Sequence, residues 1–189
     1  MAPLYHAFRG EPEVFETLVC VTAQHRQMLD QALKVFDITP DIDLNLMKQG
    51  QDLFDVTAAV LLGMRDVLRE HQPDALLVHG DTTTTLASAM AGFYQGVPVG
   101  HVEAGLRTHD LSAPFPEEFN RQVASKVMRW HFAPTAYSRE NLLAERAVES
   151  AVTVTGNTVI DALFWVLERI DSDDRRRVEI ANLLSGRLP

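Results

Sequence analysis

Apolar positions along the chain follow two alternating spacings, and the alternation predicts short strands separated by helices. Strand-like segments lie at 17–22, 42–47, 75–78, 97–102, 129–133 and 151–155. The apolar run at 75–78 is continuous, which is typical of a strand covered on both faces. Between these segments the apolar residues recur three or four positions apart, as on one face of a helix. Helical spacing begins near residues 27, 53, 82, 116, 138 and 158.

This order of elements indicates an α/β fold. Strands that alternate with helices form βαβ units, and these build a Rossmann-like parallel sheet with helices on both faces. We expect residues 1–160 to form this domain and residues 161–189 to form a linker helix. The segment 2–8 has a proline near its first turn and is predicted to be a helix. Since such domains usually begin with a strand, we expect the first strand of this one to be missing.

Composition and charge exclude several classes of protein. Of the 189 residues, 46% are hydrophobic and 23% are charged, and the formal net charge is −9. So acidic a chain is not suited to coating nucleic acid or an anionic membrane. Because it has neither a membrane-spanning apolar run nor a signal-peptide pattern, we expect it to be cytoplasmic. Cys20 is the only cysteine, so an internal disulfide and a cysteine-based zinc site are both excluded.

Three acidic segments follow predicted strands, where ligands bind in open parallel sheets. Asp81 follows the strand at 75–78, Glu103 follows the next strand, and Glu117 stands at a helix start. Asp81 has a second interpretation as the N-cap of the following helix. Glu117 also fits ordinary helix-start chemistry, because acids there are favoured by the helix dipole. Glu103 has no evident capping partner, and it is therefore the strongest single candidate for chemistry.

Other polar residues near these segments have structural explanations. His79 and His101 each stand two residues before an acid, and we expect them to support the core or the acids. The Thr82–Thr85 run suits either a helix cap or the binding of an anion or sugar hydroxyl. No histidine spacing indicates a metal site, and motifs for nicotinamide binding, the P-loop and the serine elbow are lacking. We therefore expect neither a metal nor an organic cofactor.

Together the motifs closely resemble those of one enzyme family. The sequences Val-His-Gly-Asp-Thr at 78–82, His-Val-Glu-Ala-Gly-Leu-Arg-Thr at 101–108 and Pro-Phe-Pro-Glu-Glu-Phe-Asn-Arg at 114–121 resemble signature segments of the non-hydrolysing UDP-N-acetylglucosamine 2-epimerases. Segments 22–26 and 154–161 match as well. The resemblance covers nearly the whole chain in the same order, so it is far more specific than any one motif.

The resemblance implies a fold and a reaction. The fold would be the N-terminal half of a two-domain glycosyltransferase-B-type structure, with the active site in the cleft between the domains. The reaction would interconvert UDP-N-acetylglucosamine and UDP-N-acetylmannosamine, a precursor of bacterial surface polysaccharides. The resemblance also implies a cytoplasmic homodimer that uses no metal. The family's first strand, which ends in Gly-Thr-Arg-Pro-Glu, and its C-terminal domain are both expected but absent from this sequence.

Individual site residues are also implied by the resemblance. Asp81, Glu103 and Glu117 match the catalytic acids: Asp81 and Glu117 would transfer protons, and Glu103 would stabilise positive charge at the anomeric carbon. Arg107 and Arg121 would orient these acids or counter the diphosphate. Asp81, Glu103, Arg107 and Arg121 would bind the substrate.

The resemblance further implies a second, activating substrate site. Gln24, His25 and Gln27 match the positions that line it, and Glu117 would contact the same ligand. A polar loop after a strand is an equally good interpretation of Gln24, His25 and Gln27.

Alternatives to this function come from three classes. A hydrolysing 2-epimerase would release free N-acetylmannosamine and UDP. A retaining glycosyltransferase of similar fold would need an acceptor site, of which the sequence gives no sign. An inactive fragment is the third, and we expect the chain as it stands to show no activity.

Overall fold

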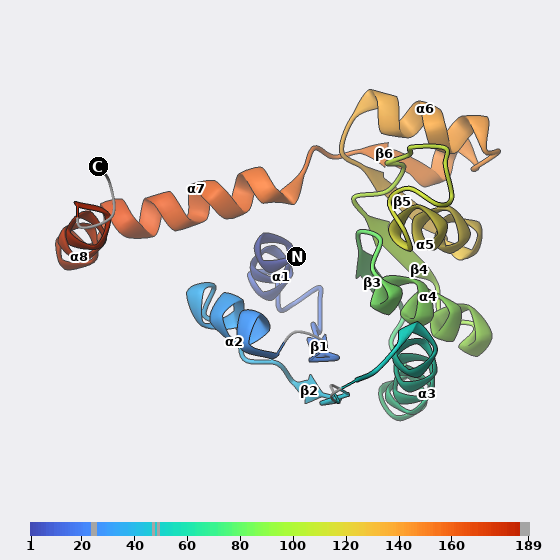
Figure 1. The fold of residues 1–189 in the computed structure, drawn as a ribbon, viewed down its shortest axis with the longest axis horizontal. Coiled ribbons are helices and arrows are strands. Elements are labelled where there is room, and N and C mark those ends of the chain that lie inside the picture. The colour runs from blue at the N-terminus through green and yellow to red at the C-terminus, as the bar shows by residue number, and fades with distance from the viewer. Residues whose placement is uncertain (24–25, 47, 49, 186–189) are drawn as a thin grey trace.

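The computed structural model describes residues 1–23, 26–46, 48 and 50–185, and within them strands alternate with helices (Figure 1). The helices are α1 (Ala2–Arg9), α2 (Arg26–Val35), α3 (Leu53–His71), α4 (Thr83–Gln95), α5 (Glu117–Ala124), α6 (Ala136–Ala144), α7 (Thr158–Asp171) and α8 (Asp174–Ser185). The strands are β1 (Cys20–Val21), β2 (Ile42–Asp43), β3 (Leu76–His79), β4 (Val99–Val102), β5 (Trp130–Ala133) and β6 (Val152–Val154). The 3-10 helices η1 (Ser125–Val127) and η2 (Glu149–Ala151) precede β5 and β6. The predicted alternation is confirmed.

The strands form two separate parallel sheets. Four strands pair in the order β3-β4-β5-β6, and β1 pairs only with β2. Within the described residues all strand pairing is therefore parallel, as predicted, but it is divided between two sheets. The strand predicted at 17–22 is also shorter than expected, because a ladder extends only as far as a neighbouring strand supplies hydrogen-bond partners.

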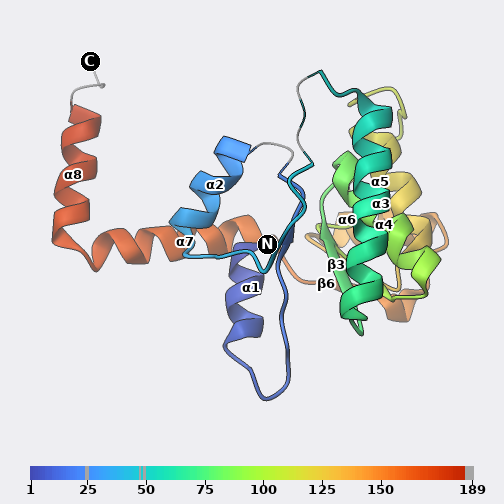
Figure 2. The same cartoon turned by 90° about the horizontal axis from the view of Figure 1, so that it is seen from below.

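Helices lie on both sides of the four-stranded sheet, as predicted. The strands from β3 to β6 follow one another in one direction, and right-handed crossovers then place α4, α5 and α6 on one face. Figure 2 shows α3 to α6 gathered on one side of β3 and β6, and α1, α2 and α7 on the other. The carboxyl ends of all four strands consequently share one edge of the sheet.

The core lies mainly between α3, α4 and the four-stranded sheet. Val60, Met64 and Leu68 of α3 pack on Ala87 and Ala91 of α4. Small side chains on α4 let that helix approach both α3 and the sheet closely. Burying a large apolar side chain contributes roughly 1.5–3 kcal/mol, so this packing holds the turn that precedes α4 in place.

Aromatic contacts join α7 to the N-terminal part of the chain. Trp165 stacks on His6 with ring centroids 5.4 Å apart, and it lies 5.0 Å from the ring of Phe36. The expected boundary after residue 160 falls within α7, which extends away from the four-stranded sheet and carries α8 at its end (Figure 1). In the part of the chain that the structure describes, no helix is long and apolar enough to cross a membrane.

Candidate active site

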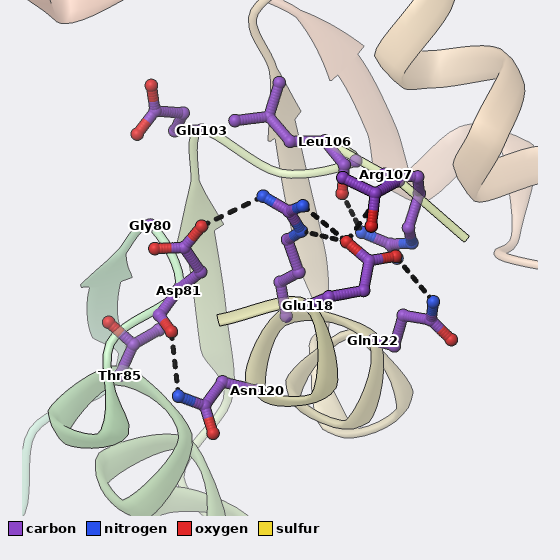
Figure 3. Close-up of polar contacts among 12 residues, drawn as sticks. Gly80, Asp81, Thr85, Glu103, Leu106, Arg107, Glu118, Asn120 and Gln122 are labelled. Carbon is purple, nitrogen blue, oxygen red and sulfur yellow. Dashed lines mark hydrogen bonds and ion pairs between the residues drawn. The ribbon is translucent and has the colours of Figure 1, made fainter. Parts of the chain in front are cut away.

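Two of the predicted acids stand on neighbouring strand ends at the carboxyl edge of the sheet. Asp81 follows β3 and Glu103 follows β4, and these strands pair in register (Figure 3). Gly80 has a φ of +70°, and a Cβ atom built on it would lie 3.6 Å from Oε2 of Glu103. The Glu103 carboxylate therefore lies against the turn that carries Asp81.

The N-cap of α4 is Thr82, so the capping interpretation of Asp81 is wrong. Thr82 Oγ1 accepts a hydrogen bond from the backbone N–H of Thr85 at 3.2 Å. The Asp81 carboxylate instead accepts a hydrogen bond at 3.0 Å from Nη1 of Arg121, and the Asp81 carbonyl accepts one at 2.9 Å from Asn120 Nδ2. Asp81 is thus held from α5, and its second carboxylate oxygen points away from the helix it precedes (Figure 3).

Glu103 has an unusual backbone conformation. Its φ is +66°, in the left-handed region that costs a residue with a side chain of order 1 kcal/mol and that is frequent at functional sites. Its Oε1 accepts a hydrogen bond from Asn157 Nδ2 at 2.9 Å, and its Oε2 lies 3.5 Å from Nε2 of His79. The strand end thereby presents a carboxylate that two neighbouring side chains orient.

Gly105 allows the loop after Glu103 to pass close to α6. Its φ is +89°, and a Cβ atom built on it would lie only 2.2 Å from the carbonyl oxygen of Ser138. Glycine alone permits this approach of the loop to α6. The loop after Glu103 is consequently packed against the body of the protein.

The two adjacent acids at the start of α5 have different environments. Glu117 is half-buried, and among the described residues its carboxylate has no hydrogen-bond partner. Glu118 is fully buried and accepts hydrogen bonds from Gln122, from Arg121 and from the backbone of Thr108. The sequence interpretation missed Glu118, although its i, i+3 spacing from Arg121 was a usable signal.

Hydrogen bonding keeps Glu118 ionised despite its burial. Burial would raise the pKa of this carboxyl, but hydrogen bonds from Gln122, Thr108, Arg121 and His109 outweigh burial and lower the pKa to about 2. The buried carboxylate is therefore a permanent negative charge beside Arg121.

The two candidate arginines are placed very differently. Arg121 lies between Glu118 and Asp81, as expected for a residue that orients an acid. Arg107 has a fully buried side chain, and its guanidinium pairs with both oxygens of Glu145 at 2.6 Å and 3.0 Å. Arg107 does not orient the site acids, because a buried guanidinium needs a carboxylate partner and Glu145 supplies it. A role of Arg107 toward the diphosphate stays a prediction.

Histidine side chains support the strand ends from within the sheet. Nε2 of the buried His101 lies 2.7 Å from the carbonyl oxygen of Gly80, which ties β4 to the turn before Asp81. Burial lowers the pKa of His101 to about 4, so the ring is neutral at pH 7. Burial also lowers the pKa of His79. These positions agree with the supporting duty predicted for both residues.

Part of the predicted activating site can be located. Gln24 and His25 lie outside the described residues. Gln27 is exposed in the first turn of α2. The role of all three stays a prediction.

A cavity of about 350 Å³ lies at the opposite edge of the sheet, where the chain enters β5 and β6. Lys126, Arg129 and Arg146 line it, near helix C-terminal ends that favour positive charge. It is lined by none of the predicted acids. The described part of the chain holds no group of three or more histidine, cysteine, aspartate or glutamate residues able to bind a metal ion.

Comparison with known sequences gives one consistent result. A family model described as UDP-N-acetylglucosamine 2-epimerase matches residues 7–186. The chain is 56% identical over 181 residues to the UDP-N-acetylglucosamine 2-epimerase of Escherichia coli (strain K12), which covers 96% of this chain and 48% of that protein. It thus spans about half the length of the curated relatives it matches.

Solved structures agree with the sequence matches. A crystal structure of UDP-GlcNAc 2-epimerase from Neisseria meningitidis bound to UDP-GlcNAc superposes with a TM-score of 0.89 at 49% identity, covering 96% of this chain and 50% of that one. The Methanocaldococcus jannaschii UDP-GlcNAc 2-epimerase, in complex with UDP-GlcNAc and UDP, gives a TM-score of 0.87 at 29% identity, covering 96% and 49%.

Proposed function

The chain belongs to the UDP-N-acetylglucosamine 2-epimerase family, and from this premise we propose that it supplies the acid-bearing half of an enzyme that interconverts UDP-N-acetylglucosamine and UDP-N-acetylmannosamine. The observation that carries the proposal is the pair of acids on adjacent strand ends, with Glu103 lying against the turn of Asp81. The product would serve the synthesis of bacterial surface polysaccharides.

The chemistry proceeds by elimination and re-addition. The C2 proton of the sugar is not acidic, so the bond between the anomeric carbon and UDP breaks as, or before, the proton leaves. This yields 2-acetamidoglucal and UDP. UDP then adds back to the anomeric carbon while a proton is delivered to the opposite face of C2. The atoms balance without any further reactant.

Three acids would divide this work. Departure of UDP builds positive charge at the anomeric carbon, and Glu103 would stabilise it, as carboxylates do in glycosidases. Asp81 and Glu117 would remove and return the C2 proton. The proposal draws support from the Arg121 contact that fixes Asp81 and from the absence of a hydrogen-bond partner for Glu117 among the described residues.

Binding and assembly complete the proposal. Arg121 would hold Asp81 in place at the reacting sugar, and the activating substrate site would form around Gln24, His25 and Gln27 with Glu117. The whole enzyme would act as a homodimer in the cytoplasm.

The test uses a completed enzyme, in which this chain is joined to the residues of the E. coli relative that lie outside the matched region. It is incubated with UDP-N-acetylglucosamine in deuterated water, and the products are examined by NMR. We expect deuterium at C2 and UDP-N-acetylmannosamine. Lack of both would reject the proposal, and free N-acetylmannosamine with UDP would instead identify a hydrolysing epimerase. The 189-residue chain alone should give no detectable turnover.

A further inference from the structure

Glu118 receives more hydrogen bonds than a helix-start acid needs. The side chain is fully buried at the second position of α5. Its Oε1 accepts from Gln122 Nε2 at 2.6 Å and from the backbone N–H of His109 at 3.0 Å. Its Oε2 accepts from the backbone N–H of Thr108 at 3.1 Å and from Arg121 Nε at 2.6 Å, and it also pairs with Arg121 Nη2.

These contacts differ from those of an ordinary acid at a helix N-terminus. Such an acid stabilises the free N–H groups of its own helix. The backbone groups bound to Glu118 belong instead to Thr108 and His109, which precede it by ten and nine residues. The carboxylate therefore fastens α5 to the loop that leaves β4.

Both acid-bearing segments meet at this one side chain. The loop that Glu118 holds is the one that begins at Glu103. On the other side, Arg121 uses Nε and Nη2 for Glu118 and keeps Nη1 for Asp81, 3.0 Å from Oδ2 (Figure 3). Asn120, from the same helix turn, donates to the Asp81 carbonyl.

We propose that Glu118 is a positioning residue for the epimerase reaction, which sets the geometry of Asp81 through Arg121 and that of Glu103 through the 103–109 loop. Glu118 itself lies too deep to touch the substrate, since none of its surface is exposed. This inference rests on the proposed function.

The test variant is Glu118→Gln in the completed enzyme. Glutamine keeps the size of the side chain, but only its oxygen accepts, so in either orientation one pair of donors, Arg121 and Thr108 or Gln122 and His109, loses its acceptor, and the charge that pairs with Arg121 is lost. We expect kcat to fall by about 10- to 100-fold, as small displacements of catalytic groups do, while KM changes by less than about threefold. Glu140→Gln on the exposed surface of α6 is the matched control and should leave both constants unchanged.

A double-mutant cycle separates positioning from general damage. If Glu118 acts partly through Asp81, Glu118→Gln should lower C2 deuterium exchange by a smaller factor in an Asp81→Asn background than in the wild type. Equal factors in both backgrounds would overturn the Asp81 branch of the proposal. An unchanged kcat in folded Glu118→Gln, beside an active wild type, would overturn all of it. An inactive wild type would reject the proposed function instead.

A second variant covers the case in which Glu118→Gln does not fold. Arg121→Lys keeps the positive charge but cannot span from Glu118 to Asp81. It should lower kcat by a similar factor with little change in KM. A rise in KM with unchanged kcat would mean that Arg121 binds substrate directly and that Glu118 does not position Asp81.

Discussion

Arg107 and Glu145 form a bidentate ion pair across 38 positions of the chain, with Nε 2.6 Å from Oε1 and Nη2 3.0 Å from Oε2. The pair joins the loop after β4 to the end of α6. The Arg107 hydrogen bond is the main cause that lowers the pKa of Glu145. The pair therefore stabilises the fold that carries the site.

Arg107→Met should destabilise the chain by about 1–3 kcal/mol, because it leaves the half-buried Glu145 carboxylate with only the weaker contact to Lys126. Urea unfolding of the 189-residue chain measures this loss. Arg129→Met, at an exposed arginine, is the control and should cost less than about 0.5 kcal/mol. Equal losses in the two variants would show that the ion pair has no special role.

Thr82 and Asp81 should separate stability from activity. Thr82→Ala removes the α4 cap and should lower the free energy of unfolding by about 1 kcal/mol. Asp81→Asn keeps the cap, so its stability should change less, while turnover of the completed enzyme falls by at least about 100-fold. If Asp81→Asn were the more destabilising change and remained active, Asp81 would have only a structural role.

Two substitutions of Glu103 should separate the effect of its backbone conformation from that of its carboxylate. Both Glu103→Ala and Glu103→Gly remove the carboxylate and should abolish turnover. Glycine tolerates the φ of +66°, so Glu103→Gly should be more stable than Glu103→Ala by about 1 kcal/mol, the reverse of the order in a helix. Thermal unfolding of the two variants tests this order. A third variant, Glu103→Gln, tests the role of the charge: if it had nearly wild-type stability and normal turnover, Glu103 would have no part in the mechanism.

Glu118 should make stability depend on pH in the acid range. Its pKa is lowered from an ordinary 4.5 to about 2 in the folded protein, so its contribution is complete above pH 4.5 and is lost as the pH falls toward 2. The stability difference between wild type and Glu118→Gln should therefore shrink by roughly 3 kcal/mol over this window. Urea unfolding at several pH values measures the difference, and a constant difference would contradict the ionised state of Glu118.

Cys20 should react slowly with thiol reagents. Burial, together with the nearby charge of Asp43, raises the pKa of this thiol to about 11, so almost no thiolate exists at neutral pH. Labelling with iodoacetamide at pH 7.5 should be far slower in the native chain than in 6 M urea, where the pKa returns to about 8.5. Equal rates would show that β1 does not shield the thiol.

The alternation of strands and helices could be predicted because it depends on local spacing. The start of α3 at Leu53 and that of α5 at Glu117 agree with the apolar pattern and with Pro116. The division into two sheets could not be predicted, since strand pairing joins residues far apart. The N-cap of α4 could not be predicted either, because Asp81 and Thr82 are both good capping residues. Arg121, distant in the sequence, binds the Asp81 carboxylate, and Thr82 caps the helix.

The sequence by itself determined that acids follow neighbouring buried strands, because carboxyl ends of parallel strands must share one edge of the sheet. Only the tertiary structure decided which acid is half-buried and which is fully buried, so Glu117 and Glu118 could not be told apart by position. It also decided the partners of the two arginines: Arg121 meets Asp81 across 40 positions, whereas Arg107 is buried on Glu145. The physical reason is that charged side chains in the interior pair by proximity in space, which local spacing does not encode.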